Sequence, residues 1–251
     1  MSASEIRVGL CGFSMAQAEY PRRFPVVEIQ HTFYQPPASA VLDRWRRTMP
    51  GGFELTIKAW QLITHTAASP TYRRLRRALT DDERAGAGAF RDSAIVAEAW
   101  RVTCECAARV RATAILFQCP ARFTPTPPHL TALRSFFARI DRPAGVNLLF
   151  EPRGPAWTPA IGRAVSDEIG AVHVVDPFVT PPVARSEDPL RYFRLHGIGG
   201  ARHVYSEGEL AELAQLAARP DSRVTYVMFN NIPRVGDAER FQARLAAFAR
   251  R

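Results

Sequence analysis

Eight short segments with the pattern of β-strands set the strongest limit on how this chain can fold. They cover residues 6–11, 26–30, 53–58, 114–118, 146–151, 171–176, 191–196 and 224–229. Apolar and polar residues alternate in segment 53–58, which is the period of a strand. Segment 114–118 is a continuous apolar run, as expected of a strand that is covered on both faces. Most of these segments are followed by a helical pattern, so the order of elements predicts a (β/α)8 barrel.

The helical patterns support this fold through their spacing and their end signals. They cover residues 39–49, much of 69–111, 127–140, 158–169, 206–218 and 237–250. Thr158 precedes Pro159 as an N-cap, and Ser206 with Glu209 fits a capping box. We expect short or missing helices after the first and sixth strands, where a proline-rich loop runs over 177–189. The sequence therefore predicts an α/β protein, a single TIM-type barrel domain over residues 1–251.

A doubly wound open sheet is the competing fold. It normally has fewer strands and often carries a glycine-rich first turn, which the Gly9 and Gly12 spacing does not match. No internal repeat or low-complexity linker divides the chain.

Composition narrows the class of protein. The 251 residues are 47% hydrophobic, and no apolar run of about 18 residues is present, so we expect no membrane span and no signal peptide. The Cys104 and Cys106 pair lacks the C-x-x-C spacing of a redox or zinc motif, and all four cysteines fit thiols in a reducing cytoplasm. A formal charge of +9 favours anionic partners, including nucleic acid, although many arginines lie on helix faces.

Polar and ionisable side chains gather at the predicted strand ends. The active site of a TIM barrel lies at the carboxyl ends of its strands, so these side chains can be collected directly. They are Ser14, Glu28, His31, Lys58, His65, Gln118, Glu151, Arg153, Asp176, Arg194, His196, Asn230 and Asn231. Turn chemistry alone would favour Gly, Asn, Ser and Pro.

Several strand-end motifs resemble those of the YecE-like family, also called domain of unknown function 72. They are Val27-Glu28-Ile29 with Thr32-Phe33-Tyr34, the stretch 53–65, Leu116-Phe117-Gln118-Cys119-Pro120, Phe150-Glu151-x-Arg153-x-x-x-Trp157, Arg194-Leu195-His196-Gly197 and Phe229-Asn230-Asn231. The resemblance implies a TIM-type barrel with a site at the rim, and it implies no reaction. The chain departs from the family at Phe13, where Trp is usual, and at Met228, where Tyr is frequent.

Four residues are candidates for acid/base catalysis. Glu28 and Glu151 could serve as acid and base, with Arg153 holding Glu151 in place. Lys58 is the only lysine in the chain and stands at the end of a strand, where its compact ammonium differs from a guanidinium. His196 could carry a proton, or its ring could pack on the rim.

The remaining candidates would bind the ligand. Arg153 and Arg194, together with Lys58, suggest an anionic group on that ligand, because guanidinium groups bind carboxylate or phosphate in a bidentate way. The other candidates are His65, Gln118, Asp176, Asn230, Asn231, Tyr34 and Trp157. An internal lattice of ion pairs with Glu28, Glu151 and Asp176 explains the same charges without a ligand.

A metal site is a further alternative, built from Glu151, Asp176 and His196. At the end of the eighth strand Asn230 stands instead of a carboxylate, and Lys58, Arg153 and Arg194 would repel a cation. We therefore expect neither a metal nor another cofactor.

These observations predict a cytoplasmic enzyme with hydrolase- or isomerase-type acid/base chemistry. Its substrate would be a small polar or anionic metabolite, such as a sugar or a phosphosugar. One rival is a protein that processes or binds nucleic acid through its basic surface. The other is a non-catalytic sensor barrel that binds a ligand without turnover.

Overall fold

The computed structural model describes residues 5–183, 188–219 and 222–248. Its elements follow in the order β1 (Glu5–Cys11), α1 (Tyr20–Arg23), β2 (Val26–Ile29), α2 (His31–Tyr34), α3 (Ser39–Thr48), β3 (Glu54–Lys58), α4 (Gln61–Thr64), the 3-10 helix η1 (Pro70–Arg74), α5 (Asp81–Gly86), α6 (Ala94–Val110), β4 (Ala114–Gln118), α7 (Pro127–Arg139), β5 (Asn147–Glu151), α8 (Pro159–Glu168), β6 (Val172–Val175), β7 (Asp188–Leu195), α9 (Glu207–Ala217), β8 (Ser222–Phe229) and α10 (Arg234–Phe248).

The eight strands form a closed barrel in the order β1 to β8, which confirms the predicted fold class. The described strand pairs are parallel, as in β1 with β2 and β4 with β5. The helix after β1 has only four residues, and the described residues between β6 and β7, 176–183, contain no helix. The predicted shortening after strands one and six is therefore present in the part that is described; residues 184–187 of the predicted loop lie outside it.

The chain divides into two compact units. The first comprises Met1–Glu28, Pro50–Glu54 and Val174–Arg251, and the second comprises Ile29–Met49 and Leu55–His173. Each unit is described by itself below, and the single domain over residues 1–251 stays a prediction.

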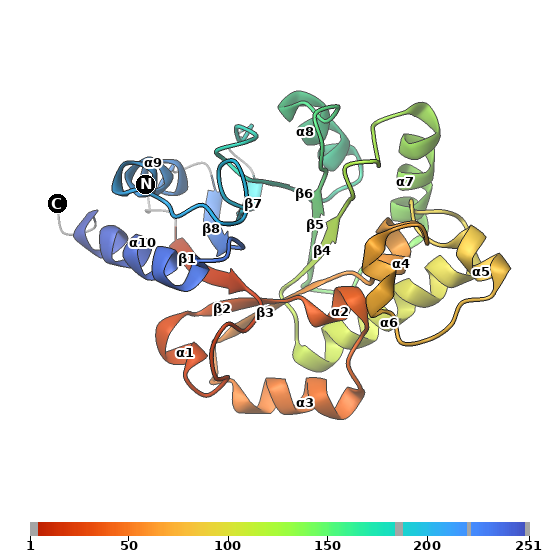
Figure 1. The fold of residues 1–251 in the computed structure, drawn as a ribbon, viewed down its shortest axis with the longest axis horizontal. Helices are drawn as coiled ribbons and strands as arrows, with labels where there is room; N and C mark the ends of the chain where they lie inside the picture. The colour runs from red at the N-terminus through yellow and green to blue at the C-terminus, as the bar shows by residue number, and fades with distance from the viewer. Residues whose placement is uncertain (1–4, 184–187, 220–221, 249–251) are drawn as a thin grey trace. The chain divides into compact units, whose positions relative to one another are not determined.

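In the first unit, β1 pairs with β2 on one side and with β8 on the other, and β7 pairs with β8. Helix α10 packs against α9, β1 and β8, and the two helices run side by side (Figure 1). The short α1 contributes Tyr20, whose buried hydroxyl accepts the amide N–H of Leu10 and donates to Val26 O. Tyr20 thus joins β1 to β2, and prolines at positions 21 and 25 limit α1 to one turn.

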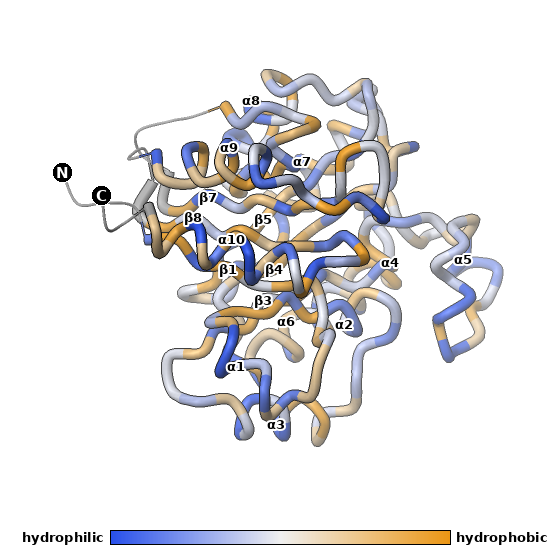
Figure 2. The backbone as a smooth tube through the Cα atoms, turned by 60° about the vertical axis from the view of Figure 1, so that its left-hand side comes forward, coloured by the Kyte–Doolittle hydropathy of each residue, from blue (hydrophilic) through white to orange (hydrophobic). Residues whose placement is uncertain are grey.

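In the second unit, β3, β4 and β5 pair in parallel, and α6 packs against α3, α4 and α5. A cluster of aromatic rings fills its core, with Phe117 of β4 in contact with Trp100, Phe136 and Phe137. Helix α5 lies outside this core, which agrees with its hydrophilic composition (Figure 2).

The segment 88–90 caps the helix α4. Gly88, Ala89 and Phe90 all have positive φ angles, of 80°, 52° and 57°. Their amide N–H groups donate to Leu62 O, Thr64 O and Ile63 O, respectively. The last carbonyls of a helix have no partner within it, so this segment satisfies the end of α4. Ala89 and Phe90 are not glycines, so their left-handed backbone conformation is strained.

The sequence analysis did not predict two of the short helices, α2 and α4, and placed their residues in loops. Each has only four residues, too few for a hydrophobic period to appear. The capping signals at Thr158 and Ser206 were read correctly, since both side chains accept the expected backbone N–H. The last helix begins earlier than expected, at Arg234, and residues 249–250 of its predicted range lie outside the described chain.

Among the described residues, no helix combines the length and the apolar character that crossing a membrane requires.

We expect Gly88→Ala to destabilise the protein more than Gly52→Ala. Both glycines have a φ of +80°, so both substitutions carry the left-handed strain of about 1–2 kcal/mol. A Cβ at position 88 would also lie 2.2 Å from the carbonyl group of His65, whereas nothing lies within 4 Å of one at position 52. Urea unfolding should show a further loss of about 1–3 kcal/mol for Gly88→Ala. Equal losses in the two variants would contradict the close packing of segment 88–90.

Candidate functional site

The second unit presents three of the predicted site residues on one face of its sheet. Lys58 lies opposite Leu116, and Gln118 lies opposite Glu151, at the carboxyl ends of β3, β4 and β5. Because side chains alternate along a strand, Leu116 and Gln118 share a face, and Lys58 and Glu151 therefore share it too. We call Lys58, Gln118, Glu151 and the adjoining Arg153 the strand-end cluster.

Lys58 is held by a polar group and an aromatic ring. Its side chain is only 4% exposed, and its ammonium donates to Gln118 Oε1 over 3.0 Å. The same nitrogen lies 4.0 Å from the ring centroid of Phe33, which is a cation–π contact. Thr32 fixes the backbone here, since its hydroxyl donates to Lys58 O over 2.7 Å. The ammonium is thus placed by β3, β4 and the short helix α2.

Glu151 is buried to the same degree, with 3% of its side chain exposed. Its Oε1 accepts a hydrogen bond from Nη1 of Arg153 over 3.1 Å, while Arg153 is about one-third exposed. The carboxylate therefore lies inside and its guanidinium partner reaches out to solvent. The sequence analysis suggested that Arg153 could hold Glu151 in place, and it made no prediction about which of the two side chains reaches solvent.

His65 follows the short helix α4 and is nearly buried. Burial, and then the charge of Lys58, lower the pKa of His65 from 6.5 to about 4. Its Nδ1 lies 2.7 Å from the hydroxyl of Thr64, and its ring packs edge-on against Phe33. His65 is therefore neutral at pH 7, and its imidazole adds no charge next to Lys58.

Tyr34 and Trp157, the two aromatic candidates, both contact other residues of the second unit. The guanidinium of Arg74 lies 3.6 Å from the ring centroid of Tyr34. Trp157 is buried, and its indole N–H donates to Phe123 O over 2.6 Å while its ring stacks on Phe123. These contacts indicate that Trp157 packs in the core of the second unit, and its predicted contact with the ligand stays a prediction.

In the first unit, Glu28 and Arg194 form a wholly buried ion pair. Neither side chain has any exposed surface. Arg194 donates from Nε to Oε2 and from Nη2 to Oε1, over 3.0 and 2.8 Å, and the hydroxyl of Tyr192 donates to Oε2 over 3.0 Å. Cys11 lies opposite Glu28 in the strand register, and its sulfur is 3.5 Å from Arg194 Nη2. The three elements β1, β2 and β7 thus meet at this pair.

His196 extends this network towards β6 and β8. Its Nε2 lies 3.4 Å from Arg194 Nη1, and its Nδ1 lies 3.0 Å from the side-chain amide of Asn230. Both neighbours are donor nitrogens, and a neutral imidazole accepts at one ring nitrogen only, so the ring takes a hydrogen bond from Arg194 or from the amide nitrogen of Asn230, and not from both. Asp176 accepts the amide N–H of His196 over 2.8 Å and that of Phe178 over 3.2 Å. Its carboxylate therefore fixes the backbone at the end of β7.

Asn231 belongs to a different part of the first unit. It is wholly buried, and its amide donates to Asp237 and to His203 O over 2.5 and 2.9 Å. Its contacts hold α10 and the loop after β7, which is a structural role.

The structure brings the predicted residues together as two groups. The second unit holds Lys58, His65, Gln118, Glu151 and Arg153, and the first unit holds Glu28, Asp176, Arg194, His196 and Asn230. In the described part of the chain, no group of three or more His, Cys, Asp and Glu side chains could hold a metal ion. The predicted arrangement of all these residues around one cavity stays a prediction.

Sequence reasoning missed several residues of these groups. Tyr192, Phe33 and Cys11 were not among the candidates, yet they contact Glu28, Lys58 and Arg194 directly. The register of the neighbouring strands was the missing information. A cavity of about 380 Å³ in the second unit was also missed, because its lining comes from segments that are far apart in the sequence.

We expect Glu28→Gln and Arg194→Met to be strongly destabilising, since each leaves a buried charge without its partner. The loss should be about 3–5 kcal/mol for each, and the double variant should recover part of it. Urea unfolding would measure these changes. Arg101→Met is the control, because Arg101 and Glu105 form an exposed pair that should contribute about 0–1 kcal/mol. Losses of that size at position 194 would show that the ion pair is not buried.

We expect His65 to make stability depend on pH. Its pKa is lower in the folded protein than in the unfolded chain, so the unfolded chain binds this proton more readily between about pH 4 and 6.5. The stabilising contribution is complete above about pH 6.5 and is lost as the pH falls towards about 4, with a slope of at most about 1.4 kcal/mol per pH unit.

Unfolding curves of the parent and of His65→Gln, recorded across this range, would measure that contribution. The difference between the two proteins should shrink as the pH falls. A difference that does not change with pH would contradict the lowered pKa.

The comparisons with solved structures show the same fold. A DUF72 family protein from Enterococcus faecalis is 21% identical, with a TM-score of 0.70, and the match covers 96% of this chain and 94% of that chain. One from Thermotoga maritima is 19% identical, with a TM-score of 0.67 and coverage of 96% and 99%. D-psicose 3-epimerase from Clostridium cellulolyticum H10, solved with D-tagatose, is 10% identical, with a TM-score of 0.59 and coverage of 97% and 98%.

At these identities, the likeness shows the fold alone. No curated protein matches the chain. The family comparison is more specific, because it covers residues 16–251 and so includes both groups of strand-end residues. It confirms the family to which the motifs pointed: the chain belongs to the family described as a protein of unknown function, DUF72.

Proposed function

We propose that the strand-end cluster binds a small polar metabolite and transfers protons on it. One observation carries this proposal: an ammonium and a carboxylate, both almost wholly buried, share one face at the carboxyl ends of β3 and β5. Taking charges out of water costs several kcal/mol each, even after relaxation. Charges retained at the end of a barrel where active sites form are candidates for chemistry.

The neighbours of these two groups suggest a division of roles. Glu151 would accept a proton as general base, and Arg153 would orient its carboxylate. Lys58 would stabilise the negative charge that develops on a neighbouring oxygen of the substrate. Gln118 contacts Lys58 and would orient the substrate by hydrogen bonds, while the neutral His65 leaves the ammonium as the positive charge there.

The first-unit residues would have supporting roles. Glu28 accepts three hydrogen bonds from Arg194 and Tyr192, so we assign it to the ion pair that organises β1, β2 and β7. His196 would remain the proton carrier of that unit, with Arg194 and Asn230 orienting its ring and Asp176 fixing its backbone.

The substrate class that this chemistry supports is a hydroxylated carbonyl compound, such as a sugar or a sugar acid. A base next to an ammonium can remove a proton beside a carbonyl group, which is isomerase-type chemistry. The structure of similar fold that contains D-tagatose makes sugars the first compounds to screen.

A thermal-shift screen with sugars, sugar acids, phosphosugars and nucleotides tests the proposal. A ligand at 100 times its Kd raises the free energy of unfolding by about 2.7 kcal/mol. A bound ligand with no turnover would favour the sensor alternative. Binding of nucleic acid that weakens steeply with salt would favour the nucleic-acid alternative.

We expect Lys58→Arg and Lys58→Met both to lose binding of an uncharged sugar that the screen identifies. The larger guanidinium cannot occupy the space between Gln118 and the Phe33 ring in the same way. Affinity should fall at least about tenfold, or about 1.4 kcal/mol, while the parent and Lys58→Arg melt at similar temperatures.

Arg101→Lys is the control for this change of side chain, because Arg101 is exposed on α6. Arg74 would be a poor control, since it stacks on Tyr34. Full binding by Lys58→Arg would show that Lys58 supplies only a positive charge.

A further inference from the structure

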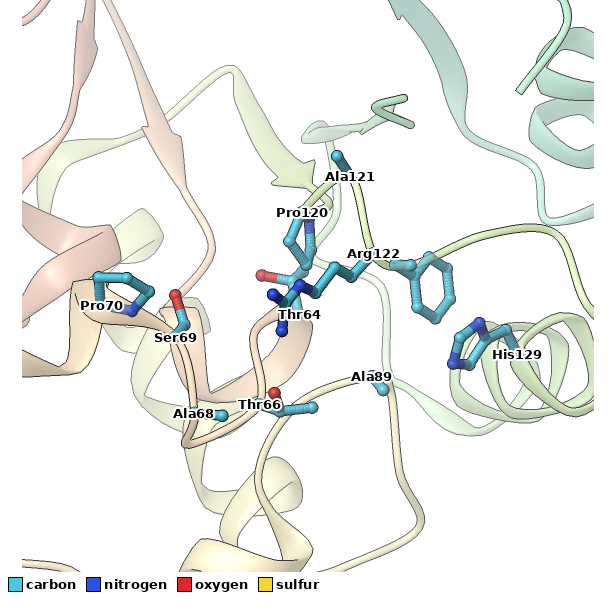
Figure 3. Close-up of a pocket in the computed structure, with 11 residues that line it drawn as sticks. Thr64, Thr66, Ala68, Ser69, Pro70, Ala89, Pro120, Ala121, Arg122 and His129 are labelled. Carbon is cyan, nitrogen blue, oxygen red and sulfur yellow. The ribbon is translucent and has the colours of Figure 1, made fainter. Parts of the chain in front are cut away.

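A pocket in the second unit lies beside the strand-end cluster and is built from other residues. Its volume is about 380 Å³, and it is lined by Thr64, Thr66, Ala68, Ser69, Pro70, Ala89, Pro120, Ala121, Arg122, Phe123 and His129 (Figure 3). Thr64 lines the pocket, and its hydroxyl is 2.7 Å from Nδ1 of His65. His65 in turn lies near Lys58, whose charge lowers its pKa. Pockets for small molecules are commonly about 300–1,000 Å³, so this one can take a compact metabolite.

The floor of the pocket is rigidly built. Ala89 lines it and belongs to the left-handed segment that caps the carbonyls of α4. The glycine before it, Gly88, touches the backbone of His65 and Thr66 with no room for a Cβ. Backbone strain of this kind persists where the surroundings hold it in place, and it gathers at ligand sites.

One wall is a stack of aromatic rings. The imidazole of His129 stacks on Phe123 at 4.6 Å, and Phe123 in turn stacks on Trp157. Nδ1 of His129 donates to Thr124 O over 2.8 Å, since a carbonyl can only accept. Nε2 is therefore the ring nitrogen that a ligand could use. Trp157 supports this wall through its contacts with Phe123, and its predicted contact with the ligand stays a prediction.

The lining residues carry a positive charge and no negative charge. Arg122 extends from the loop after β4 into the middle of the pocket (Figure 3). Within the described residues its guanidinium makes no hydrogen bond or ion pair. Thr64, Thr66 and Ser69 add hydroxyl groups, and no lining residue carries a carboxylate. Such a set of groups favours an anion, because guanidinium binds carboxylate and phosphate through paired N–H groups.

We propose that this pocket is a binding site for a small metabolite with an anionic group, a phosphate monoester or a carboxylate. Arg122 and the hydroxyls bind the anionic group, and His129 Nε2, which is an acceptor when Nδ1 carries the proton, takes a hydrogen bond from a hydroxyl of the metabolite. The prolines and alanines of the walls, Pro70 and Pro120 among them, cover the carbon skeleton. The site is separate from the proposed chemistry at Lys58 and Glu151, and either can fail without the other.

Isothermal titration with four probes tests the proposal: glucose, gluconate, glucose 6-phosphate and inorganic phosphate. We expect saturable one-site binding of glucose 6-phosphate or gluconate at millimolar concentrations or below, and none of glucose. Which of the two binds identifies the anionic group. If inorganic phosphate bound as strongly as glucose 6-phosphate, the sugar would contribute nothing to the affinity. That result would overturn the metabolite site.

Variants then locate the binding. Arg122→Gln should weaken it at least about tenfold, or about 1.4 kcal/mol, and Arg122→Lys should restore part of it. Arg44→Gln is the matched control, because Arg44 is also exposed, lies in the same unit outside the pocket, and loses the same charge. It should change the affinity by less than about twofold.

Lys58→Met separates this site from the strand-end cluster. Binding should stay within about threefold of the parent in that variant. A tenfold loss in Lys58→Met with no loss in Arg122→Gln would place the anion at Lys58 and overturn the proposal. Absence of saturable binding of both gluconate and glucose 6-phosphate would overturn it as well.

Discussion

The register of the parallel strands decides which side chains of this protein can act together. In the second unit, the pairing of Gln118 with Glu151 and of Lys58 with Leu116 puts three polar groups on one face at the strand ends. In the first unit, the pairing of Cys11 with Glu28 places the carboxylate where Arg194 can reach it. A shift of one residue in either sheet would turn these side chains to the opposite face.

The two units handle their buried charges differently. Glu28 is matched by a guanidinium in a bidentate geometry with a tyrosine hydroxyl as a third donor, which leaves its oxygens well satisfied. Among the contacts described for Lys58 and Glu151 are an amide and an aromatic face for the ammonium, and a partly exposed arginine for the carboxylate. We place chemistry at Lys58 and Glu151 because both charged groups lie almost wholly buried on one face at the carboxyl ends of their strands.

Short helices bring the two proposed sites of the second unit close together. Helix α2 supplies Phe33 and Thr32 to Lys58, and helix α4 carries Thr64 next to His65. Segment 88–90 binds the carbonyl end of α4 and forms part of the pocket floor. The same backbone therefore supports the neutral imidazole beside Lys58 and one wall of the anion pocket. Strain in this segment is the cost of a preformed site.

The sequence by itself determined the eight strands, the long helices, the caps at Thr158 and Ser206, and the family, because these depend on short-range patterns of polarity and on local hydrogen bonds. It also identified Lys58, Glu151 and Arg194 as strand-end residues. Only the tertiary structure decided their partners. Glu28 and Arg194 are 166 positions apart, and Lys58 and Gln118 are 60 apart, so no local pattern could pair them. The pocket around Arg122 is lined by the end of α4 and the segment after it, by Ala89, by the loop after β4 and by His129 of α7, and these segments meet only through the packing of the unit.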